Sequence, residues 1–484
     1  MVDTILEPNV VHCAVAPGHG YDAAESVAAP ELPSGRASTA AAIALRQLLR
    51  HAGLDRARYG TAEWKPLREI VRAGASVLLK PNWVLHENHS GSGLESLVTH
   101  VSVIESFLPY LAQVRPGRVV IGDAPVQGCD FHALATAVGI DEIVERYQRT
   151  LPDLVVRDFR LTELVGARSW SRLRETGRSA ADYVQFDLGC DSLLEPLAGT
   201  ADRLRVTMYD PGRMQETHAP GRHRYLIARE ALEAEVVFNL PKLKTHKKAA
   251  ITGALKNAVG INGSKASLPH HRKGNSTVGG DCYRERSLIK SWAEDVLDAM
   301  NHTDSRVARY SLAKLVSTLK LYASSLGQDV DFEGSWYGND TVWRMSLDIQ
   351  RILHYGRADG GLADAAQRAV LTLTDAIVAG EGEGPLAPTP VPLGLLTFGI
   401  NVAALEWAHA GLMGLDPMAV PIVREAFSQF RYPLATFSPS DVSVVLDGTR
   451  ISPEDLARRH GRAFLPPKGW RQHCEKQVSE KAAC

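Results

Sequence analysis

The chain has few cysteines, and none of them forms a paired motif. Its six cysteines are far apart, at Cys13, Cys129, Cys190, Cys282, Cys474 and Cys484. None has the C-x-x-C spacing that holds zinc or an iron–sulfur cluster. The sequence therefore argues against an iron–sulfur cofactor.

Long apolar runs and a surplus of positive charge are also missing. No run of about 18 apolar residues occurs, and the amino terminus lacks the basic and apolar regions of a secretory signal. The 54 Lys and Arg residues are balanced by 55 Asp and Glu residues, so no global basic excess is present to neutralise nucleic-acid phosphates. No G-x-G-x-x-G motif follows a predicted strand, which disfavours a nucleotide-dependent dehydrogenase. We expect a soluble, cytoplasmic protein without a membrane or nucleic-acid partner.

Apolar runs typical of buried strands alternate with helical patterns along the chain, which predicts an α/β fold with mostly parallel sheets. Strands are expected at 74–83, 118–125, 235–240, 369–375 and 395–399, and helices at 38–52, 100–111 and 401–411.

The length of 484 residues exceeds what one hydrophobic core usually serves, so we expect two packed α/β lobes. The predicted units are an N-terminal lobe at 1–234, a C-terminal lobe at 235–450 with a helical insertion at about 283–357, and a tail at 451–484 that is polar and poorly ordered from Lys468.

Residues 235–283 combine a short apolar run with a cluster of lysines. Glu235 to Leu240 predicts a buried strand, which Pro241 ends because it removes the next ladder donor. Ligands of open α/β sheets collect beyond the carboxyl ends of strands, so the following Lys242, Lys244, Thr245 and His246 predict a cation-rich turn that binds an anion. The alternative is a solvated loop, above all for Lys247 and Lys248.

Other predicted strands also end in polar side chains, namely Lys80 with Asn82, and Asp123. Asp123 is a candidate partner for a metal or a hydroxyl, and the alternative is a turn residue that binds its own backbone. We expect one cleft between the lobes to be lined by Lys80, Asp123, Lys242, His246, Lys256 and Asp375.

Three residues are candidates for catalysis. His246, whose ordinary pKa is near neutrality, is a candidate general acid or base or a metal ligand. Lys256 neutralises developing charge or, if burial lowers its pKa, acts covalently. Asp123 is the third candidate.

A divalent-cation site is predicted at Asp375, Glu381 and Glu383, provided that their oxygens converge.

The candidate substrate-binding residues are Lys80, Asn82, Lys242, Lys244, Thr252, Gly253 and Asn257. Thr252 or Gly253 is expected to begin a helix whose free amides favour an anion. Gly253 and Gly260 are expected to let the backbone approach the ligand closely. Lys244 is expected to point into the crevice and Lys248 to be exposed.

Three segments resemble the DUF362 family: Asn239 to His246 followed by Thr252 to Asn257 and a glycine, Val77 to Asn82, and Gly380 to Pro385. The resemblance spans most of residues 70–410 and implies little about activity, since the family is named for lacking an assigned function. Many members carry a ferredoxin-like cysteine cluster, which this chain lacks. The motif order is also similar to that of two-lobed lactate-racemase-like proteins, whose nickel pincer cofactor we do not carry over.

A crevice that holds both cations and carboxylates favours an enzyme acting on a phosphorylated or carboxylated small metabolite, with or without a divalent metal. The alternative is a non-catalytic protein that binds an anion or a cofactor, or a redox partner. The substrate, the reaction class and the cofactor stay open at this point.

Overall fold

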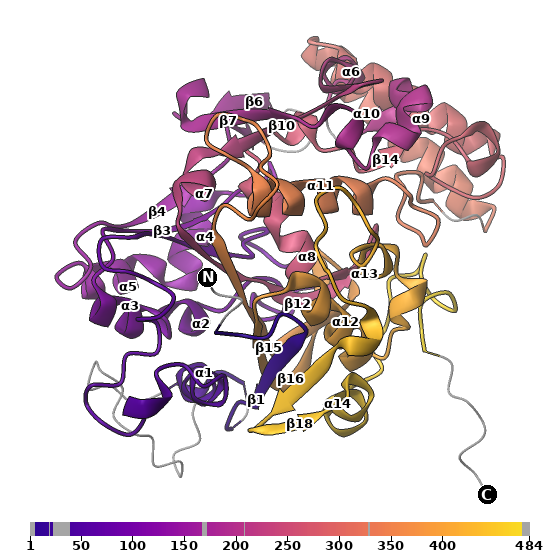
Figure 1. The fold of residues 1–484 in the computed structure, drawn as a ribbon. Helices are drawn as coiled ribbons and strands as arrows, with labels where there is room; N and C mark the ends of the chain where they lie inside the picture. The colour runs from indigo at the N-terminus through magenta and orange to yellow at the C-terminus, as the bar shows by residue number, and fades with distance from the viewer. Residues whose placement is uncertain are drawn as a thin grey trace, which may run out of the picture.

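A large mixed β-sheet runs through the part of the chain that this computed structural model describes, which is residues 5–18, 20–22, 39–166, 172–207, 209–327 and 330–476 (Figure 1). Within these residues the sheet contains 11 strands. In spatial order they are β18 (Thr449–Ile451), β17 (Ser443–Leu446), β1 (Val10–Val15), β16 (Ala387–Gly399), β15 (Ala369–Glu383), β11 (Val236–Leu240), β2 (Ser76–Pro81), β3 (Arg118–Asp123) and β4 (Leu154–Asp158), with β12 (Lys242–His246) paired to β15 and to β13 (Ala250–Thr252).

The strands from β15 to β4 are all parallel to their neighbours along this order, and parallel pairs predominate in the sheet. The predicted α/β class with a mostly parallel sheet is therefore confirmed. Strands from both sides of the predicted boundary at 234/235 lie next to one another, because β11 pairs with β2 on one edge and with β15 on the other. The boundaries of the domains themselves stay a prediction.

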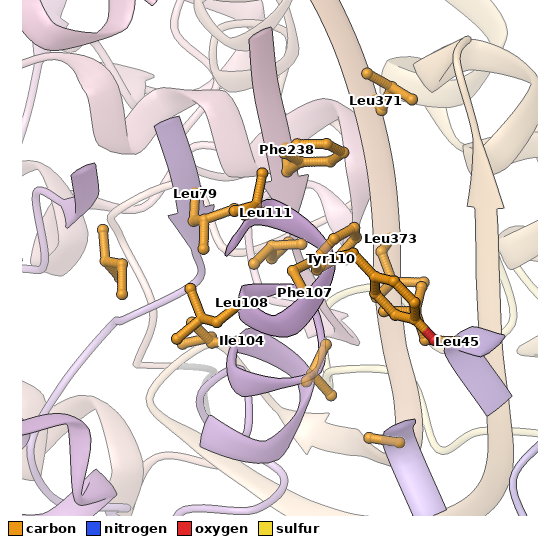
Figure 2. Packing of buried hydrophobic residues seen from close by; sticks show 14 of the residues in the cluster. Leu45, Leu79, Ile104, Phe107, Leu108, Tyr110, Leu111, Phe238, Leu371 and Leu373 are labelled. Carbon is orange, nitrogen blue, oxygen red and sulfur yellow. The ribbon is translucent and has the colours of Figure 1, made fainter. Parts of the chain in front are cut away.

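One face of the sheet packs against α1 (Ala40–His51), α2 (Val101–Glu105) and α3 (Leu108–Val114). Figure 2 shows Phe107, Leu108 and Leu111 of this layer against Leu79 of β2 and Phe238 of β11. On β11, Phe238 joins this core while Val237 joins the core on the opposite face. Both faces of the strand are thus covered, which is why its sequence is a continuous apolar run.

The opposite face is covered by α8 (Ala254–Asn257), α11 (Val342–Tyr355), α12 (Val402–Leu412) and α13 (Pro421–Glu425). The helical segment predicted at about 283–357 contains α9 (Leu288–His302), α10 (Arg306–Ser325) and α11. Only α9 and α10 project from the fold as a helical pair (Figure 1). In contrast, α11 is part of the core, because most of its residues are buried.

The remaining elements surround the sheet. The helices are α4 (Phe131–Val138), α5 (Ile140–Tyr147), α6 (Pro211–Thr217), α7 (Arg229–Glu233) and α14 (Pro453–His460). The strands are β5 (Thr162–Val165), β6 (Arg172–Glu175), β7 (Tyr183–Asp187), β8 (Leu204–Arg205), β9 (His218–Ala219), β10 (Arg222–Ala228) and β14 (His271–Arg272). Among the described residues, no helix has the length and apolar character that crossing a membrane requires.

The segment after α14 packs onto the fold, so the expectation of a poorly ordered tail from Lys468 is wrong as far as residue 476. Trp470 and Cys474 are fully buried in the core beside α12. The Trp470 indole N–H donates to the Lys247 carbonyl at 2.6 Å. Residues 477–484 lie outside the described part of the chain.

The lysine-rich segment after Pro241 is a strand, so the predicted turn is wrong. β12 continues directly from β11 and pairs with the second half of β15, with Lys242 opposite Asp375 and Lys244 opposite Gly380. All its residues are buried. Because side chains alternate along a strand, Lys242, Lys244 and His246 share one face, whereas Leu243 enters the apolar core.

Candidate functional site

A cavity of about 360 Å³ lies at the carboxyl ends of β2, β3 and β12, where open α/β sheets place ligands. The predicted site residues that line it are Lys80, Asn82, Asp123, His246, Thr252, Lys256 and Asn257. Lys265 and His270, which were not predicted from the sequence, line it as well. The predicted residues outside its lining are Lys242, Lys244, Gly253, Asp375, Glu381 and Glu383.

Lys80 and Asp123 form an ion pair at the floor of the cavity. Lys80 Nζ lies 2.8 Å from Asp123 Oδ1 and also donates to the Pro81 carbonyl and to Asn257 Oδ1. Asp123 Oδ2 accepts the Trp83 N–H at 2.6 Å. Burial lowers the pKa of Lys80 and raises that of Asp123, and the ion pair opposes both shifts. Both groups are engaged by the protein, so this pair holds the strand ends together.

The backbone must approach this ion pair closely at Gly260. A Cβ atom there would lie 1.8 Å from Asp123 Oδ1 and 2.7 Å from Lys80 Nζ. The Asp123 carboxylate and the Lys80 ammonium occupy that space. Gly260 itself lines the cavity, and the backbone there lies close to these two side chains, while its close approach to a ligand stays a prediction.

The two asparagine amides of the floor are bound to the protein as well. Asn257 donates to Asn239 Oδ1 at 2.7 Å and accepts from Asn82 at 3.1 Å. Asn82 Oδ1 accepts from Lys244 Nζ at 2.8 Å, and Lys244 also donates to the Leu97 carbonyl. Lys244 therefore lies beneath Asn82 and supports the floor. Burial lowers its pKa well below the usual value.

Lys248, which was expected to be exposed, is half-buried. Its Nζ lies 3.2 Å from His271 Nδ1. The predicted contrast between an inward-pointing Lys244 and an exposed Lys248 is therefore wrong, because neither side chain lines the cavity and neither is exposed.

Lys242 and Asp375 form a separate buried ion pair with Tyr21. Lys242 Nζ lies 2.5 Å from Asp375 Oδ2 and 2.5 Å from the Tyr21 hydroxyl. The His100 N–H donates to the same carboxylate at 2.9 Å. Because these groups bind one another and lie outside the cavity lining, the single cleft expected for all six charged residues does not include them.

The structure does not bring Asp375, Glu381 and Glu383 together as a metal site. Glu381 Oε2 accepts the Leu465 N–H at 2.8 Å, and Glu383 Oε1 accepts the Lys468 N–H at 2.9 Å. Both glutamates thus hold the segment after α14. Among the described residues, no group of three or more His, Cys, Asp and Glu side chains is arranged to hold a metal ion.

The N-terminus of α8 is occupied by a carboxylate of the protein itself. The Ala254 N–H donates to Glu406 Oε2 at 2.5 Å. A Cβ atom at Gly253 would lie 2.4 Å from the same oxygen. The expected anion at this helix start is therefore Glu406 of α12, and Gly253 makes room for it rather than for a ligand.

Two groups of the cavity have unused hydrogen-bonding capacity. Lys256 has no hydrogen bond or ion pair at its ammonium within the described residues, although only 9% of the residue is exposed. Burial, together with the nearby Lys265 and Lys248, lowers its pKa to about 7. The Thr252 hydroxyl is buried and has no partner among the described residues. These groups present a cation and a hydroxyl to the cavity.

Lys265 adds a third lysine to the lining, after Lys80 and Lys256. Its Nζ donates to the Ala124 carbonyl at 2.7 Å, which uses one of its three donors. Burial lowers its pKa to about 8, and the Asp123 carboxylate opposes this shift.

The two histidines of the cavity differ in hydrogen-bonding character. His246 Nδ1 accepts the Lys248 N–H at 3.0 Å, so the proton of the neutral ring is on Nε2. His270 Nδ1 donates to the Leu268 carbonyl at 2.7 Å, so its Nε2 carries a lone pair. Burial and nearby lysines lower the pKa of both rings well below the usual value. His246 is thus a neutral N–H donor at neutral pH, whereas an imidazolium would be needed for strong general-acid catalysis.

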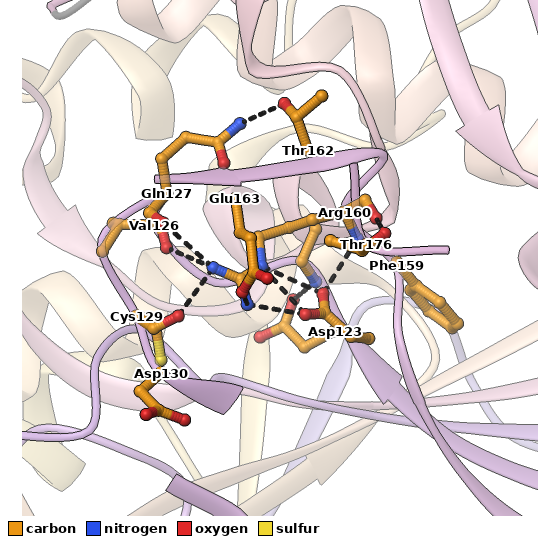
Figure 3. Close-up of polar contacts among 12 residues, drawn as sticks. Asp123, Val126, Gln127, Cys129, Asp130, Phe159, Arg160, Thr162, Glu163 and Thr176 are labelled. Carbon is orange, nitrogen blue, oxygen red and sulfur yellow. Dashed lines mark hydrogen bonds and ion pairs between the residues drawn. The ribbon is translucent and has the colours of Figure 1, made fainter. Parts of the chain in front are cut away.

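The loop after β3 forms one wall of the cavity, and Arg160 fixes its shape (Figure 3). The fully buried Arg160 guanidinium donates to the carbonyls of Val126, Gln127 and Cys129 at 3.1, 3.2 and 2.8 Å. Its other N–H groups bind Asp158 of β4. The wall is therefore held by a charge-assisted network that the spacing of residues in sequence does not reveal.

Part of the site lies in a segment that is similar to the DUF362 family. The model of that family, described as a domain of unknown function, matches residues 186–411, which include β12, β13, α8 and β15. The thylakoid-associated protein sll1697 of Synechocystis sp. is 23% identical over 352 residues, which cover 73% of this chain and 67% of that protein.

A crystal structure of a Thermotoga maritima protein matches with 10% sequence identity and a TM-score of 0.31. The match covers 74% of this chain and 57% of that chain, so this protein spans little more than half the length of that structure.

Proposed function

We propose that this protein, whose residues 186–411 match the DUF362 family model, binds a small anionic metabolite in the cavity above β2, β3 and β12 and acts on it as an enzyme. The observation that carries the proposal is Lys256, a buried lysine that lines the cavity without an ion-pair partner in the described chain. A buried charge requires compensation, and the one carboxylate that the described residues place at the floor, Asp123, is already paired with Lys80. A carboxylate or phosphate group of the ligand supplies this missing charge.

The neighbouring groups suit the same ligand. The Thr252 hydroxyl and the remaining donors of Lys265 are available to its oxygens, and His246 offers a neutral N–H. In a site with little water, hydrogen bonds to a charged acceptor are stronger than those between neutral groups. The anion is thus bound by Lys256, Thr252 and Lys265, while Lys80 and Asp123 keep the floor in place.

The reaction that the two imidazoles support is a proton transfer on the bound ligand. The Nε2 lone pair of His270 accepts a proton, and the Nε2–H of His246 stabilises negative charge that develops on the ligand. The low pKa of His270 keeps its lone pair free at neutral pH. Each role is filled by a different ring because the hydrogen bond at Nδ1 fixes the tautomer of each.

Isothermal titration with inorganic phosphate and acetate tests the binding step. Loss of a charge-assisted contact costs about 1.5–3 kcal/mol, so Lys256→Met is expected to weaken the affinity about 10- to 150-fold. Lys247→Met is the matched control, because Lys247 is 41% exposed and pairs with Glu383 outside the cavity. Equal affinities in the two variants would contradict the proposed site.

The catalytic step is tested by deuterium incorporation from D₂O into bound anions, measured by mass spectrometry across a panel of carboxylates. His270→Asn is expected to slow the exchange about 10²- to 10⁴-fold while the affinity is retained. Tight binding with no exchange for any anion that stabilises the protein would identify a binding protein without this catalysis.

A further inference from the structure

The cavity lining combines charged and apolar side chains. Lys80, Asp123 and Asn257 at the floor are almost completely buried. Leu164, Leu173, Val206 and Leu386 also line the cavity and are less buried, with Leu173 36% exposed. The site therefore offers charged groups at its floor and partly exposed apolar side chains elsewhere in its lining.

The hairpin of β5 and β6 accounts for much of this apolar wall. Leu164 faces Leu173 directly across the two strands, and Glu163 faces Arg174 at the adjacent position. Because side chains of neighbouring residues point to opposite faces of a strand, the leucine pair and the Glu163–Arg174 ion pair lie on opposite faces. The hairpin is thus amphipathic, and its leucine face contributes to the cavity.

The leucine pair is not explained by the packing of the fold. Neither Leu164 nor Leu173 belongs to an apolar core cluster of the described residues. The hairpin forms a two-stranded sheet of its own and pairs with no other described strand. Two apolar side chains on such a hairpin, left partly exposed beside a cavity, are expected when a ligand covers them.

The size of the cavity also supports a ligand that has an apolar group beside its charged head. Cavities of about 300–1,000 Å³ enclose whole small-molecule ligands. A volume of about 360 Å³ is much larger than a single carboxylate or phosphate group needs, so the charged head of a ligand fills only the inner part. The remaining space borders the leucine face of the hairpin.

We infer that the ligand is an amphiphilic anion, whose carboxylate or phosphate head binds at Lys256 and whose apolar group lies against Leu164 and Leu173. The inference rests on the proposed anion site and adds the chemical class of the ligand. A carboxylic acid and a phosphate monoester with the same apolar group share this chemistry.

Calorimetric titration of the wild-type protein with acetate, butanoate, hexanoate and octanoate tests the inference. Burial of each methylene group is expected to tighten the binding about 3- to 4-fold while the chain lies inside the cavity. A parallel series of alkyl phosphates shows which head group the floor prefers. Because these measurements use the unaltered protein, they do not depend on the folding of a variant.

Two variants of the hairpin locate the apolar group. Leu173→Thr introduces a polar, β-branched residue that suits a strand, and it is expected to reduce the gain per methylene while the affinity for acetate is unchanged. Arg174→Thr is the matched control, because it alters the adjacent residue on the other face and breaks only an exposed ion pair. The control is expected to keep the full dependence on chain length.

The outcomes separate the inference from the proposed function. Short anions that bind in a Lys256-dependent manner, without any gain from added methylenes, would overturn the inference and leave the anion site standing. A gain that persists in the Leu164→Thr, Leu173→Thr double variant would overturn the assignment of the hairpin as the apolar wall. A complete absence of anion binding to the wild-type protein would refute the proposed function itself.

Discussion

Two lysines that line the same cavity, Lys80 and Lys256, differ in what compensates their charge. Lys80 has the Asp123 carboxylate at 2.8 Å, whereas Lys256 has no ion pair in the described chain. Lys80→Met leaves the buried Asp123 carboxylate without its ion-pair partner and is expected to cost about 3–5 kcal/mol of unfolding free energy. Lys256→Met removes an uncompensated buried charge and is expected to stabilise the ligand-free protein. Urea unfolding at pH 6 measures both effects.

The lowered pKa of Lys256 makes the stability difference between Lys256→Met and the wild-type protein depend on pH. The folded-state pKa is about 7, below the ordinary value of 10.5, so between these values the unfolded chain binds more protons than the folded one. The Lys256 contribution to stability therefore rises with pH across this window. The advantage of Lys256→Met is expected to be largest below pH 7 and to shrink toward pH 10. An advantage that does not change with pH would contradict a charged, buried Lys256.

The affinity for an anion is expected to fall as the pH rises, whereas the stability contribution of Lys256 rises. Lys256 loses its proton as the pH rises through about 7, and Lys265 follows at about 8. The affinity for acetate, whose own charge is constant above pH 6, is therefore expected to fall above pH 7, by at most about tenfold per pH unit for each proton. His246 and His270 stay neutral in this range, because their pKa values are well below the usual value.

Lys256→Arg is the variant that checks this assignment, because a guanidinium stays charged to beyond pH 12. It is expected to remove the part of the pH dependence that begins near 7 and to keep the part due to Lys265. Titration calorimetry at pH 6, 7, 8 and 9 distinguishes the two profiles. Identical profiles for the variant and the wild-type protein would assign the titration to another group.

The sequence predicts part of this site at the level of residues and misses part of it. Lys80 and Asp123 are recognisable because each lies at the end of a strand whose preceding residues are clearly apolar. Lys265 and His270 are not predictable from the sequence, because no periodic pattern marks residues 263–270. Only the folded chain brings them to the cavity. The pairing of Lys242 with Asp375 is equally hidden, since the two residues are 133 positions apart.

At the scale of elements, the segment from Lys242 to His246 shows how burial overrides composition. A lysine-rich run normally indicates a solvated loop, and this one is a buried strand. The alternation of Lys242, Leu243 and Lys244 is a sequence signal for this strand, because a period of two is typical of a strand. The strand tolerates its lysines because Lys242 pairs with Asp375 and Lys244 donates to Asn82.

The start of α8 changes what a substitution at Gly253 should do. If Gly253 lets the backbone approach a ligand, as the sequence predicts, Gly253→Val impairs binding more than folding. The structure reverses this expectation, because the added side chain would collide with the Glu406 carboxylate at the helix start. Overpacking typically costs about 1–3 kcal/mol, so Gly253→Val is expected to lower the unfolding free energy by about this amount. Glu406→Ala combined with Gly253→Val should recover part of the loss, and denaturant unfolding of the set measures the coupling.

At the scale of the whole molecule, the class of the fold is predictable and the order of its strands is not. Alternating strand and helix patterns indicate an α/β sheet, which the structure has. The placement of β1 between β16 and β17 joins the first strand of the chain to strands almost 400 and more than 430 residues later. No local pattern encodes such a pairing, because it depends on non-local packing.

Because of this strand order, we predict that the two lobes expected from the sequence do not fold independently. If residues 1–234 and 235–484 are produced as separate chains, the second piece lacks β1, which lies between two of its own strands. The first piece in turn exposes the edge of β2 that β11 covers. Unpaired edges of this kind promote association and aggregation. We therefore expect neither piece to unfold cooperatively alone, and we expect the two to copurify when they are coexpressed.

Near-UV circular dichroism with urea unfolding of each piece tests this expectation. A sharp, reversible transition in both isolated pieces would show two independent domains and would restore the boundary at 234/235.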